Sequence, residues 1–328
     1  MIAITGANGL LGSFILKKFI SEKLPVIGLK RVKSNISHLD EFIPKTEWRE
    51  ADITNSLSLT DAFKNVHTIV HAAAVVSFDP RAKEKIYQAN VIGTQNIVNA
   101  CLASDIPRLI FISSVAALGR KKGAAEINEE NRWTEGELNS DYAKSKYLAE
   151  LEVYRGQEEG LSVSIINPSI ILSAADPNKS SAQLFKYVQQ KRMFYVDGTI
   201  NYVDVRDVAE LVYKIYKTPV PGEKYIANAG TVGLSELMQK IAVRLGKKGP
   251  SIKINPRLLR LAAWAEEMRC KFTGSEALIS RQSVKMPAEK LIYHNNKSIH
   301  QLNMAYRPLD ETLDWCCAYY RNAFTTNK

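Results

Sequence analysis

Hydrophobic and polar positions follow two alternating patterns along the first two thirds of the chain. Short apolar, β-branched runs followed by turn residues predict strands, and longer stretches with apolar residues at helical spacing predict helices. The predicted strands are Ile2–Thr5, Pro25–Lys30, Glu47–Ala51, Thr68–His71, Arg108–Ser113 and Ser162–Asn167. The predicted helices lie near Leu10–Ser21, Ser56–Phe63, Ala82–Ala103 and Ser140–Glu158. Apolar strands that alternate with helices favour a doubly wound α/β fold, in which helices cover both faces of a parallel sheet.

The pattern changes near Asn178, beyond which the chain becomes mostly helical with isolated short strands. This change predicts a smaller, mostly helical lobe toward the C-terminus. Within it, Tyr202–Lys217 combines an apolar strand with a helical stretch, and we expect this segment to return to the first domain. The expected division is residues 1–168 and about 200–228 for the larger α/β domain, and about 169–199 and 229–328 for the smaller lobe.

A glycine-rich turn follows the first predicted strand. Gly6, Gly9 and Gly12 stand at three-residue intervals where the first helix begins. Such glycines allow a tight bend and a close approach of the backbone to a pyrophosphate, while the helix N-terminus offers free N–H groups to the anion. A plain strand–helix turn can also carry glycines, but the strand, the helix and the later parallel units together favour a dinucleotide site.

The end of the second predicted strand indicates which dinucleotide the turn would bind. Sites for NAD place an acidic residue there to bond the ribose 2′-hydroxyl, whereas NADP needs a cation for its 2′-phosphate. Here the strand runs into Lys30 and Arg31, and the next acidic residue is Asp40. These cations favour NADP, with NAD as the alternative, although a solvated basic turn would carry the same residues.

Tyr142 and Lys146 stand four residues apart near the start of a strongly helical segment. Positions i and i+4 share a helix face, so both side chains can face one site. A nearby cation stabilises the phenolate and lowers the tyrosine pKa from its ordinary value of about 10, so that the phenol can exchange a proton opposite a hydride transfer. Ser114 ends the fifth strand, at the sheet edge where open α/β proteins bind ligands, and could bond a substrate oxygen. A serine at a strand end is also common as a cap.

Composition and charge narrow the classes of partner. The sequence carries 44 Lys and Arg against 34 Asp and Glu, a formal net charge of +10, which suits nucleic acid, an anionic membrane or a phosphate-bearing ligand. Because the basic residues are scattered and no nucleic-acid-binding motif occurs, we expect no nucleic-acid partner. Four cysteines without C-x-x-C pairs predict neither a disulfide framework nor a metal site, and Cys316 and Cys317 are expected to be buried. With no leader-like or long apolar segment, the prediction is a cytoplasmic protein without a transmembrane segment.

Several motifs in the chain resemble those of the extended short-chain dehydrogenase/reductase family, also described as NAD-dependent epimerases and dehydratases. The sequence looks similar to the dihydroflavonol reductase, cinnamoyl-CoA reductase and 3β-hydroxysteroid dehydrogenase group of that family. The matching motifs are Thr5–Gly12, Asp52-Ile53, His71–Ala74, Asn90–Thr94, Ser113-Ser114, Tyr142–Lys146, Asn167–Ser169 and Tyr202–Ala209. The resemblance implies a Rossmann domain that binds NAD(P) and a smaller lobe that binds the substrate.

The resemblance also implies roles for individual residues. Tyr142 would be the acid–base residue, Lys146 would lower its pKa and hold the nicotinamide ribose, and Ser114 would orient the substrate oxygen. The implied cofactor-binding residues are Gly6, Asn8, Gly9, Leu10, Leu11, Gly12, Lys30, Arg31, Asp52, Ile53, Ala72, Ala73, Ala74, Asn90, Ser113, Tyr142, Lys146, Asn167, Pro168 and Ser169. Asn167 stands where arginine is usual in the family. Lys30 stands where sugar-nucleotide enzymes commonly carry Asp, which supports NADP and argues against the epimerase branch.

The leading hypothesis is an NADPH-dependent oxidoreductase that reduces a carbonyl, or in reverse oxidises a secondary alcohol, on an apolar or aromatic small molecule. The alternative is a nucleoside-diphosphate-sugar epimerase or dehydratase with tightly bound NAD, and a non-catalytic dinucleotide sensor would not need the Tyr–Lys pair. The helix expected at Pro256–Phe272 could be a lid, a core helix or a membrane contact, with the core helix favoured. The loop between Gly119 and Asp141, which contains Glu129 and Trp133, is expected to border the pocket, and a homodimer is left open.

Overall fold

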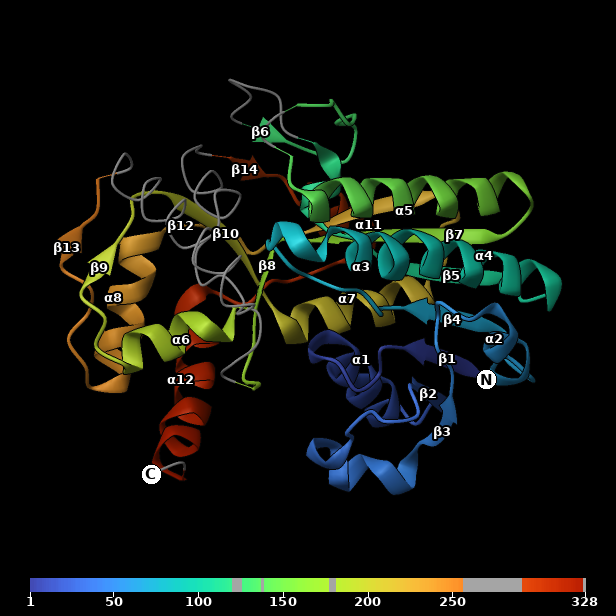
Figure 1. Cartoon of the computed structure of the whole chain (residues 1–328), viewed down its shortest axis with the longest axis horizontal. Coiled ribbons are helices and arrows are strands. Elements are labelled where there is room, and N and C mark those ends of the chain that lie inside the picture. The colour runs from blue at the N-terminus through green and yellow to red at the C-terminus, as the bar shows by residue number, and fades with distance from the viewer. Residues whose placement is uncertain (120–125, 137–138, 177–180, 256–290, 327–328) are drawn as a thin grey trace.

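The centre of the fold is a seven-stranded sheet in which every neighbouring pair of strands is parallel (Figure 1). The computed structural model describes residues 1–119, 126–136, 139–176, 181–255 and 291–326. In spatial order the strands are β11 (Glu223–Ala227), β7 (Ser162–Pro168), β5 (Arg108–Ile112), β4 (Thr68–His71), β1 (Ile2–Thr5), β2 (Val26–Lys30) and β3 (Glu47–Glu50). This order confirms the predicted doubly wound, Rossmann-like α/β fold.

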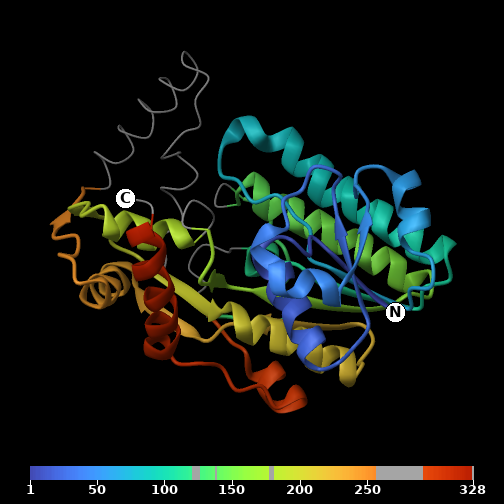
Figure 2. The same ribbon diagram turned by 90° about the horizontal axis from the view of Figure 1, so that it is seen from below.

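Helices cover both faces of the sheet, as Figures 1 and 2 show from two directions. One face carries α1 (Leu10–Ser21), α7 (Val205–Lys217) and α11 (Asn296–Leu302). The other face carries α2 (Ser56–Ala62), α4 (Gly93–Ala103) and α5 (Asp141–Glu158), with the short α3 (Lys83–Tyr87) against α5.

Each face of the sheet has its own hydrophobic core, because successive strand residues point to opposite sides. In β5, Ile110 and Ile112 pack with α1 and α7, whereas Leu109 and Phe111 pack with α2, α4 and α5. All four side chains are buried. Burial on both sides explains why the inner strands are apolar along most of their length, whereas the edge strand β3 is partly exposed and carries charged residues.

The stretch that the pattern predicts as one helix over Ala82–Ala103 is divided in the structure. A 3₁₀ turn, η2 (Pro80–Ala82), leads into α3, and a wider π-type turn, η3 (Gln88–Ile92), separates α3 from α4. The wider turn coincides with Asn90, whose side chain bonds both backbone groups of Val75 at 2.7 and 2.9 Å. Turns of this kind are frequent at functional sites, and they widen the helical repeat locally, so that the buried Ile86 and Val91 stand five residues apart.

A second group of elements lies beyond the carboxyl end of β7, at the left of Figure 1. It contains a three-stranded sheet of β8 (Ile170–Leu172), β10 (Thr199–Asp204) and β12 (Gly230–Gly233), packed with α6 (Ala182–Gln189), α8 (Leu234–Leu245) and α12 (Leu309–Thr326). Two short strand pairs are β9 (Phe194–Tyr195) with β13 (Ile252–Lys253), and β6 (Glu126–Ile127) with β14 (Ile292–Tyr293). Cys316 and Cys317 are buried in this core as expected, and burial raises the pKa of the Cys317 thiol to about 11.

The chain crosses between the two groups of elements at Tyr202–Lys217. Tyr202 packs in the core of the second group, whereas Val203 and the whole of α7 pack on the seven-stranded sheet. β11 then completes the edge of that sheet beside β7. The helix expected at Pro256–Phe272 lies outside the described residues. In the described ranges, no helix is long and apolar enough to cross a membrane.

Candidate active site

The strand order reverses between β1 and β4, because the chain proceeds from β1 to β2 and β3 on one side and from β4 to β5 and β7 on the other. At such a switch point the loops after neighbouring strands diverge and leave a crevice for a ligand. A cavity of about 1040 Å³ opens there and continues to α6 and β10. The predicted site residues that line it are Gly6, Asn8, Gly9, Leu10, Leu11, Gly12, Lys30, Arg31, Asp52, Ile53, Ala72, Ala73, Ala74, Ser113, Ser114, Tyr142, Lys146, Pro168 and Ser169.

The glycine turn leaves no room for side chains. A Cβ on Gly12 would lie 2.0 Å from the Gly6 carbonyl oxygen, and one on Gly6 would lie 2.9 Å from Ala73 Cα. Gly6 also adopts a φ of 64°, which favours glycine. α1 begins at Leu10 with no side-chain cap and no acidic residue in its first turn, so its first N–H groups are free to bind an anion.

His71, at the end of β4, connects the glycine turn to the neighbouring loop. Thr5 Oγ1 accepts the N–H groups of Ala72 and Ala73, each at 3.1 Å, so its own proton is directed to His71 Nδ1 at 2.7 Å. The ring must therefore carry its proton on Nε2, which donates to Thr94 Oγ1 at 3.1 Å. These bonds fix one tautomer and hold the loop after β4 beside the end of β1.

We expect His71 to make stability depend on pH. Burial, with a smaller effect from the charge of Lys146, lowers the pKa of His71 to about 3. In the unfolded chain the pKa of His71 is about 6.5. Below that pH the unfolded state binds a proton that the folded state does not bind, so the free energy of unfolding falls as the pH drops. Between pH 8 and pH 5 the folding advantage of the natural protein over His71→Gln should shrink by about 2 kcal/mol in urea titrations.

The matched control for this prediction is His300→Gln on α11, where the side chain is exposed. Its stability relative to the natural protein should be the same at both pH values. If the stability difference between the natural protein and His71→Gln is also the same at both pH values, that result contradicts a His71 that is buried and neutral.

Tyr142, Ser114 and Lys146 meet at the carboxyl end of β5. Ser140 caps α5 by accepting the Ala143 N–H at 3.1 Å, which places Tyr142 in the first turn of the helix with its ring on the cavity. Ser114 Oγ caps the 3₁₀ turn η4 (Val115–Leu118) by accepting the Ala116 N–H at 3.2 Å and also bonds the Tyr142 hydroxyl. The hydroxyl of Ser114 is therefore a cap and a cavity group together.

The surroundings of the Tyr–Lys pair oppose charge. Burial raises the pKa of Tyr142, and the Ser114 hydrogen bond lowers it in part. Burial also lowers the pKa of Lys146 to about 7, against the effect of Glu150, which raises it. Lys146 is 2% exposed, and Nζ donates to the Ile112 carbonyl at 2.7 Å and lies 4.4 Å from the centre of the Phe111 ring. At neutral pH the phenol is protonated, and the ammonium loses its proton near that pH.

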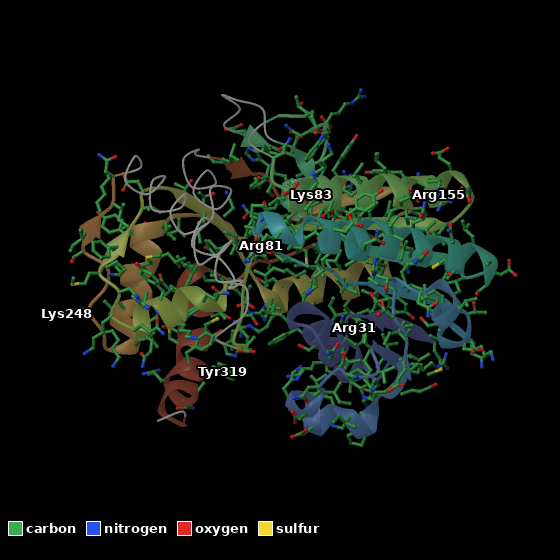
Figure 3. The ribbon with its side chains drawn as sticks, in the orientation of Figure 1. Arg31, Arg81, Lys83, Arg155, Lys248 and Tyr319 are labelled. Atoms are coloured by element: carbon green, nitrogen blue, oxygen red, sulfur yellow. The ribbon has the colours of Figure 1, made fainter. Side chains whose placement is uncertain are left out.

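The two cations at the end of β2 differ in their partners. Lys30 Nζ pairs with Glu50 on β3 at 2.8 Å. Arg31, labelled in Figure 3, is exposed, lines the cavity and has no acidic partner within the described ranges. Asp52 and Ile53 also line this end, and the Asp52 carboxylate accepts the Thr54 N–H at 2.9 Å. Arg31 is therefore the cation that this end of the cavity offers to an anion.

Two expected cofactor-binding residues do not line the cavity. Asn90 and Asn167 are buried behind it, where Asn90 holds Val75 and Asn167 Nδ2 donates to the Ser114 carbonyl at 2.8 Å. Each amide donates both to backbone next to the cavity and to a side chain of α5, Asn90 to Ser145 and Asn167 to Glu150, so both support the cavity wall.

The expectation that the loop between Gly119 and Asp141 borders the cavity is wrong for two of its residues, Glu129 and Trp133. Glu129 accepts the Ile226 N–H on the edge strand β11 at 2.9 Å, and Trp133 stacks on Tyr147 of α5 with ring centres 4.7 Å apart. Neither side chain lines the cavity. Both side chains have partners on other elements, a backbone N–H of the edge strand β11 for Glu129 and the ring of Tyr147 for Trp133.

The far wall of the cavity could not be located from the sequence. It is formed by residues of separate elements, among them the apolar Leu184 of α6, Ile200 of β10 and Leu234 of α8 and the polar Thr199 and Asn201 of β10. Phe78 lines the nearer part and contacts Tyr142 edge to face, with ring centres 6.2 Å apart. No local spacing connects these residues, because only the tertiary fold brings their elements to one cavity.

Two charges behind the Tyr–Lys pair, the buried Glu150 and the partly buried Lys224, were also not identified from the sequence. Glu150 lies one helical turn after Lys146 on α5, and Lys224 on β11 pairs with it at 2.6 Å. The i+4 spacing from Lys146 to Glu150 is a signal that could have found the carboxylate. Lys224 offers no such signal, since it comes from a strand 74 residues later.

The switch-point crevice, the uncapped glycine turn and the parallel sheet define a Rossmann-like α/β protein with its ligand cavity at the carboxyl edge. A sequence model of the NAD dependent epimerase/dehydratase family matches residues 2–230. The chain belongs to this family, the extended short-chain dehydrogenases/reductases, and is an enzyme. The resemblance read from the motifs is thereby confirmed.

Curated relatives and solved structures include both reductases and epimerases. A putative dihydroflavonol 4-reductase of Synechocystis sp. is 26% identical, over 97% of this chain and 94% of the relative. The crystal structure of gox2253 is 27% identical with a TM-score of 0.84, covering 98% of each chain. The UDP-glucose 4-epimerase of Thermotoga maritima, solved with UDP-glucose, shares the fold at 17% identity and a TM-score of 0.81, covering 98% of this chain and 99% of that one.

Proposed function

We propose that this enzyme uses NADPH to reduce the carbonyl group of an apolar or aromatic small molecule, and in reverse oxidises the secondary alcohol. The observation that carries the proposal is the meeting of Tyr142, Ser114 and Lys146 on one cavity that has a glycine cradle at one end and an apolar wall at the other. Residues 1–168 and about 200–228 would bind the cofactor, and the remaining residues would form the substrate lobe.

The residues present fit a nicotinamide dinucleotide. Gly6, Gly9 and Gly12 carry no side chains, and the turn has no room for an added Cβ. Because no side chain covers the backbone there, a pyrophosphate can approach it, next to the uncapped start of α1. Asp52 and Ile53 would flank the adenine, and Ala72, Ala73 and Ala74 would border the cofactor toward the nicotinamide half. When bound, the reduced nicotinamide supplies the hydride that the carbonyl carbon gains.

Three side chains would complete the reduction. Ser114 and Tyr142 donate hydrogen bonds to the carbonyl oxygen, and Tyr142 gives its proton to that oxygen as the C=O bond becomes C–OH. Burial keeps the phenol protonated at neutral pH, which is the form that reduction needs. Lys146, held by the Ile112 carbonyl, stabilises the phenolate that remains.

The lining of the cavity supports an apolar substrate. Its far wall contains Leu184, Ile200 and Leu234 together with the uncharged polar Thr199 and Asn201, and Phe78 lies against Tyr142. Among the described residues, the cations that line the cavity are Lys30, Arg31, Lys85 and Lys146. Most of these lie at the cofactor end or beside Tyr142, so the far wall favours a neutral molecule over a sugar nucleotide diphosphate.

We expect Arg31 to discriminate between the two dinucleotides. Arg31→Gln should weaken NADPH binding about tenfold and leave NADH binding unchanged, because a charge-assisted contact to the 2′-phosphate is worth roughly 1.5 kcal/mol. Titration of the protein with each dinucleotide, followed by nucleotide fluorescence, measures both affinities. Lys33→Gln is the matched control, because Lys33 is exposed two residues later and does not line the main cavity.

Retention of the NADPH preference in Arg31→Gln would contradict this assignment. Loss of the preference in Lys33→Gln as well would instead indicate a general effect of positive charge.

The experiment that tests the proposed activity is NADPH oxidation with a panel of aromatic and aliphatic aldehydes and ketones. The proposal predicts turnover with apolar members. No turnover by a protein that binds NADPH normally would overturn it. Co-purification of tightly bound NAD, with interconversion of UDP-sugars and no net reduction, would establish the epimerase alternative.

A further inference from the structure

An ion pair between the buried Glu150 and the partly buried Lys224 lies behind the Tyr–Lys pair, and the proposed reaction does not use it. Glu150 of α5 is 2% exposed, and its Oε2 accepts a hydrogen bond from Lys224 Nζ at 2.6 Å. The Lys224 side chain is 14% exposed. A buried ion pair usually adds little stability compared with apolar residues of similar volume, so stability alone does not explain its presence.

The second carboxylate oxygen of Glu150 is bonded to the active-site strands. Oε1 accepts the Ser113 hydroxyl at 2.5 Å and Asn167 Nδ2 at 2.7 Å. Asn167 Nδ2 also donates to the carbonyl oxygen of Ser114 at 2.8 Å. The carboxylate therefore ties α5 to the ends of β5 and β7, on either side of the serine that faces the cavity.

The same carboxylate acts on Lys146, because its negative charge raises the pKa of the Lys146 ammonium. The titratable groups that face Lys146 are Tyr142 and Glu150 on its own helix and His71 on β4, which is neutral. Lys224 reaches this group from β11 through its contact with Glu150. In the buried interior a charge one helical turn away acts strongly, because little water screens it.

We propose that Glu150 and Lys224 form a positioning pair: Glu150 holds the Ser113–Ser114 backbone in place and supplies the negative charge that keeps Lys146 an ammonium, while Lys224 limits that charge. The inference rests on the proposed function, since it assigns the pair to the service of Tyr142. Burial lowers the pKa of Lys146 to about 7 and Glu150 raises it, so the pair acts where Lys146 titrates in the physiological range.

The two members of the pair have opposite effects on Lys146. Glu150→Gln removes the attractive charge and leaves the Lys224 cation, so Lys146 should lose its proton at lower pH than in the natural protein. Lys224→Met removes the opposing cation and should move the midpoint to higher pH. The double variant lacks both charges and should fall between the natural protein and Glu150→Gln.

The test is an NMR titration of the full-length protein labelled with [ε-¹³C]lysine, without cofactor or substrate. Lys146→Met identifies the Lys146 signal by its loss. The expected midpoint of the natural protein is near 7. Each single variant should shift it by about one pH unit, downward in Glu150→Gln and upward in Lys224→Met. Lys297→Met, which removes a cation paired with Glu223 next to Lys224, is the matched control and should leave the midpoint unchanged.

Lys146 midpoints that do not move, or that move in the same direction in both single variants, would overturn the proposal. A pair with only a structural role would not shift the midpoint in opposite directions when its negative and its positive member are removed. If a single variant fails to fold, the double variant decides: a midpoint at or above that of the natural protein overturns the proposal. The titration needs no turnover, so failure to reduce any carbonyl would remove the proposed function and leave this result to be judged by itself.

Discussion

Tyr142→Phe is expected to lower the rate of carbonyl reduction by about 10²- to 10⁴-fold while NADPH affinity stays within a small factor of the natural value. The substitution removes one hydroxyl at the meeting point with Ser114, and with it the proton that the carbonyl oxygen would receive. The ring, its edge contact with Phe78 and the start of α5 remain. Single-turnover measurement of NADPH oxidation under saturating substrate isolates this loss from substrate binding.

Tyr147→Phe is the control, because Tyr147 belongs to the same helix and stacks on Trp133, away from the cavity. It should leave the rate unchanged. A Tyr142→Phe enzyme that retains the natural rate would show that another group delivers the proton. Equal losses in both variants would point to a general disturbance of α5.

Gly12→Ala is expected to weaken NADPH binding by about 10- to 100-fold and to lower the free energy of unfolding by about 1–3 kcal/mol. The added Cβ would lie 2.0 Å from the Gly6 carbonyl oxygen and 2.7 Å from the Gly6 carbonyl carbon, both backbone atoms of the turn. That clash can be relieved only if the turn or the start of α1 moves, and either movement displaces the N–H groups that would hold the pyrophosphate. Calorimetric titration with NADPH and urea unfolding measure the two losses.

Gly136→Ala provides the matched control, because a Cβ at Gly136 meets nothing within 4 Å. It should leave both quantities unchanged. An alanine at position 12 that binds NADPH as tightly as glycine would contradict the close approach of a phosphate to this turn.

The inner strands of the parallel sheet could be predicted from the sequence because burial on both faces makes them continuous apolar runs, whereas the edge strand β11, which begins with the charged Glu223 and Lys224, is missed. β1, β4 and α1 begin and end at the predicted residues. The predicted helix over Ala82–Ala103 is divided instead by the π-type turn at Gln88–Ile92, which the pattern does not reveal because one widened turn is too short to alter the overall helical pattern of the sequence. Its cause is tertiary, in the bonds from Asn90 to Val75.

Some cavity residues can be found from local spacing in the sequence, and others are brought together only by the tertiary fold. Local spacing revealed Gly12, Tyr142 and Lys146, because a turn and a helix face bring neighbours in sequence to one site. The partner of Glu150 could not be found, since Lys224 reaches it across the sheet from β11. The same holds for the far wall, whose residues come from several elements.

The central claim is that hydride passes to a carbonyl carbon at the site of Tyr142. The most direct measurement uses NADPH that carries deuterium at both positions of nicotinamide C4, with an apolar aldehyde or ketone, and analyses the product by mass spectrometry and NMR. The account predicts one deuterium on the carbinol carbon, one NADP⁺ formed for each alcohol, and at least a hundredfold less of both with Tyr142→Phe. An alcohol without deuterium, or equal product from Tyr142→Phe, would contradict it.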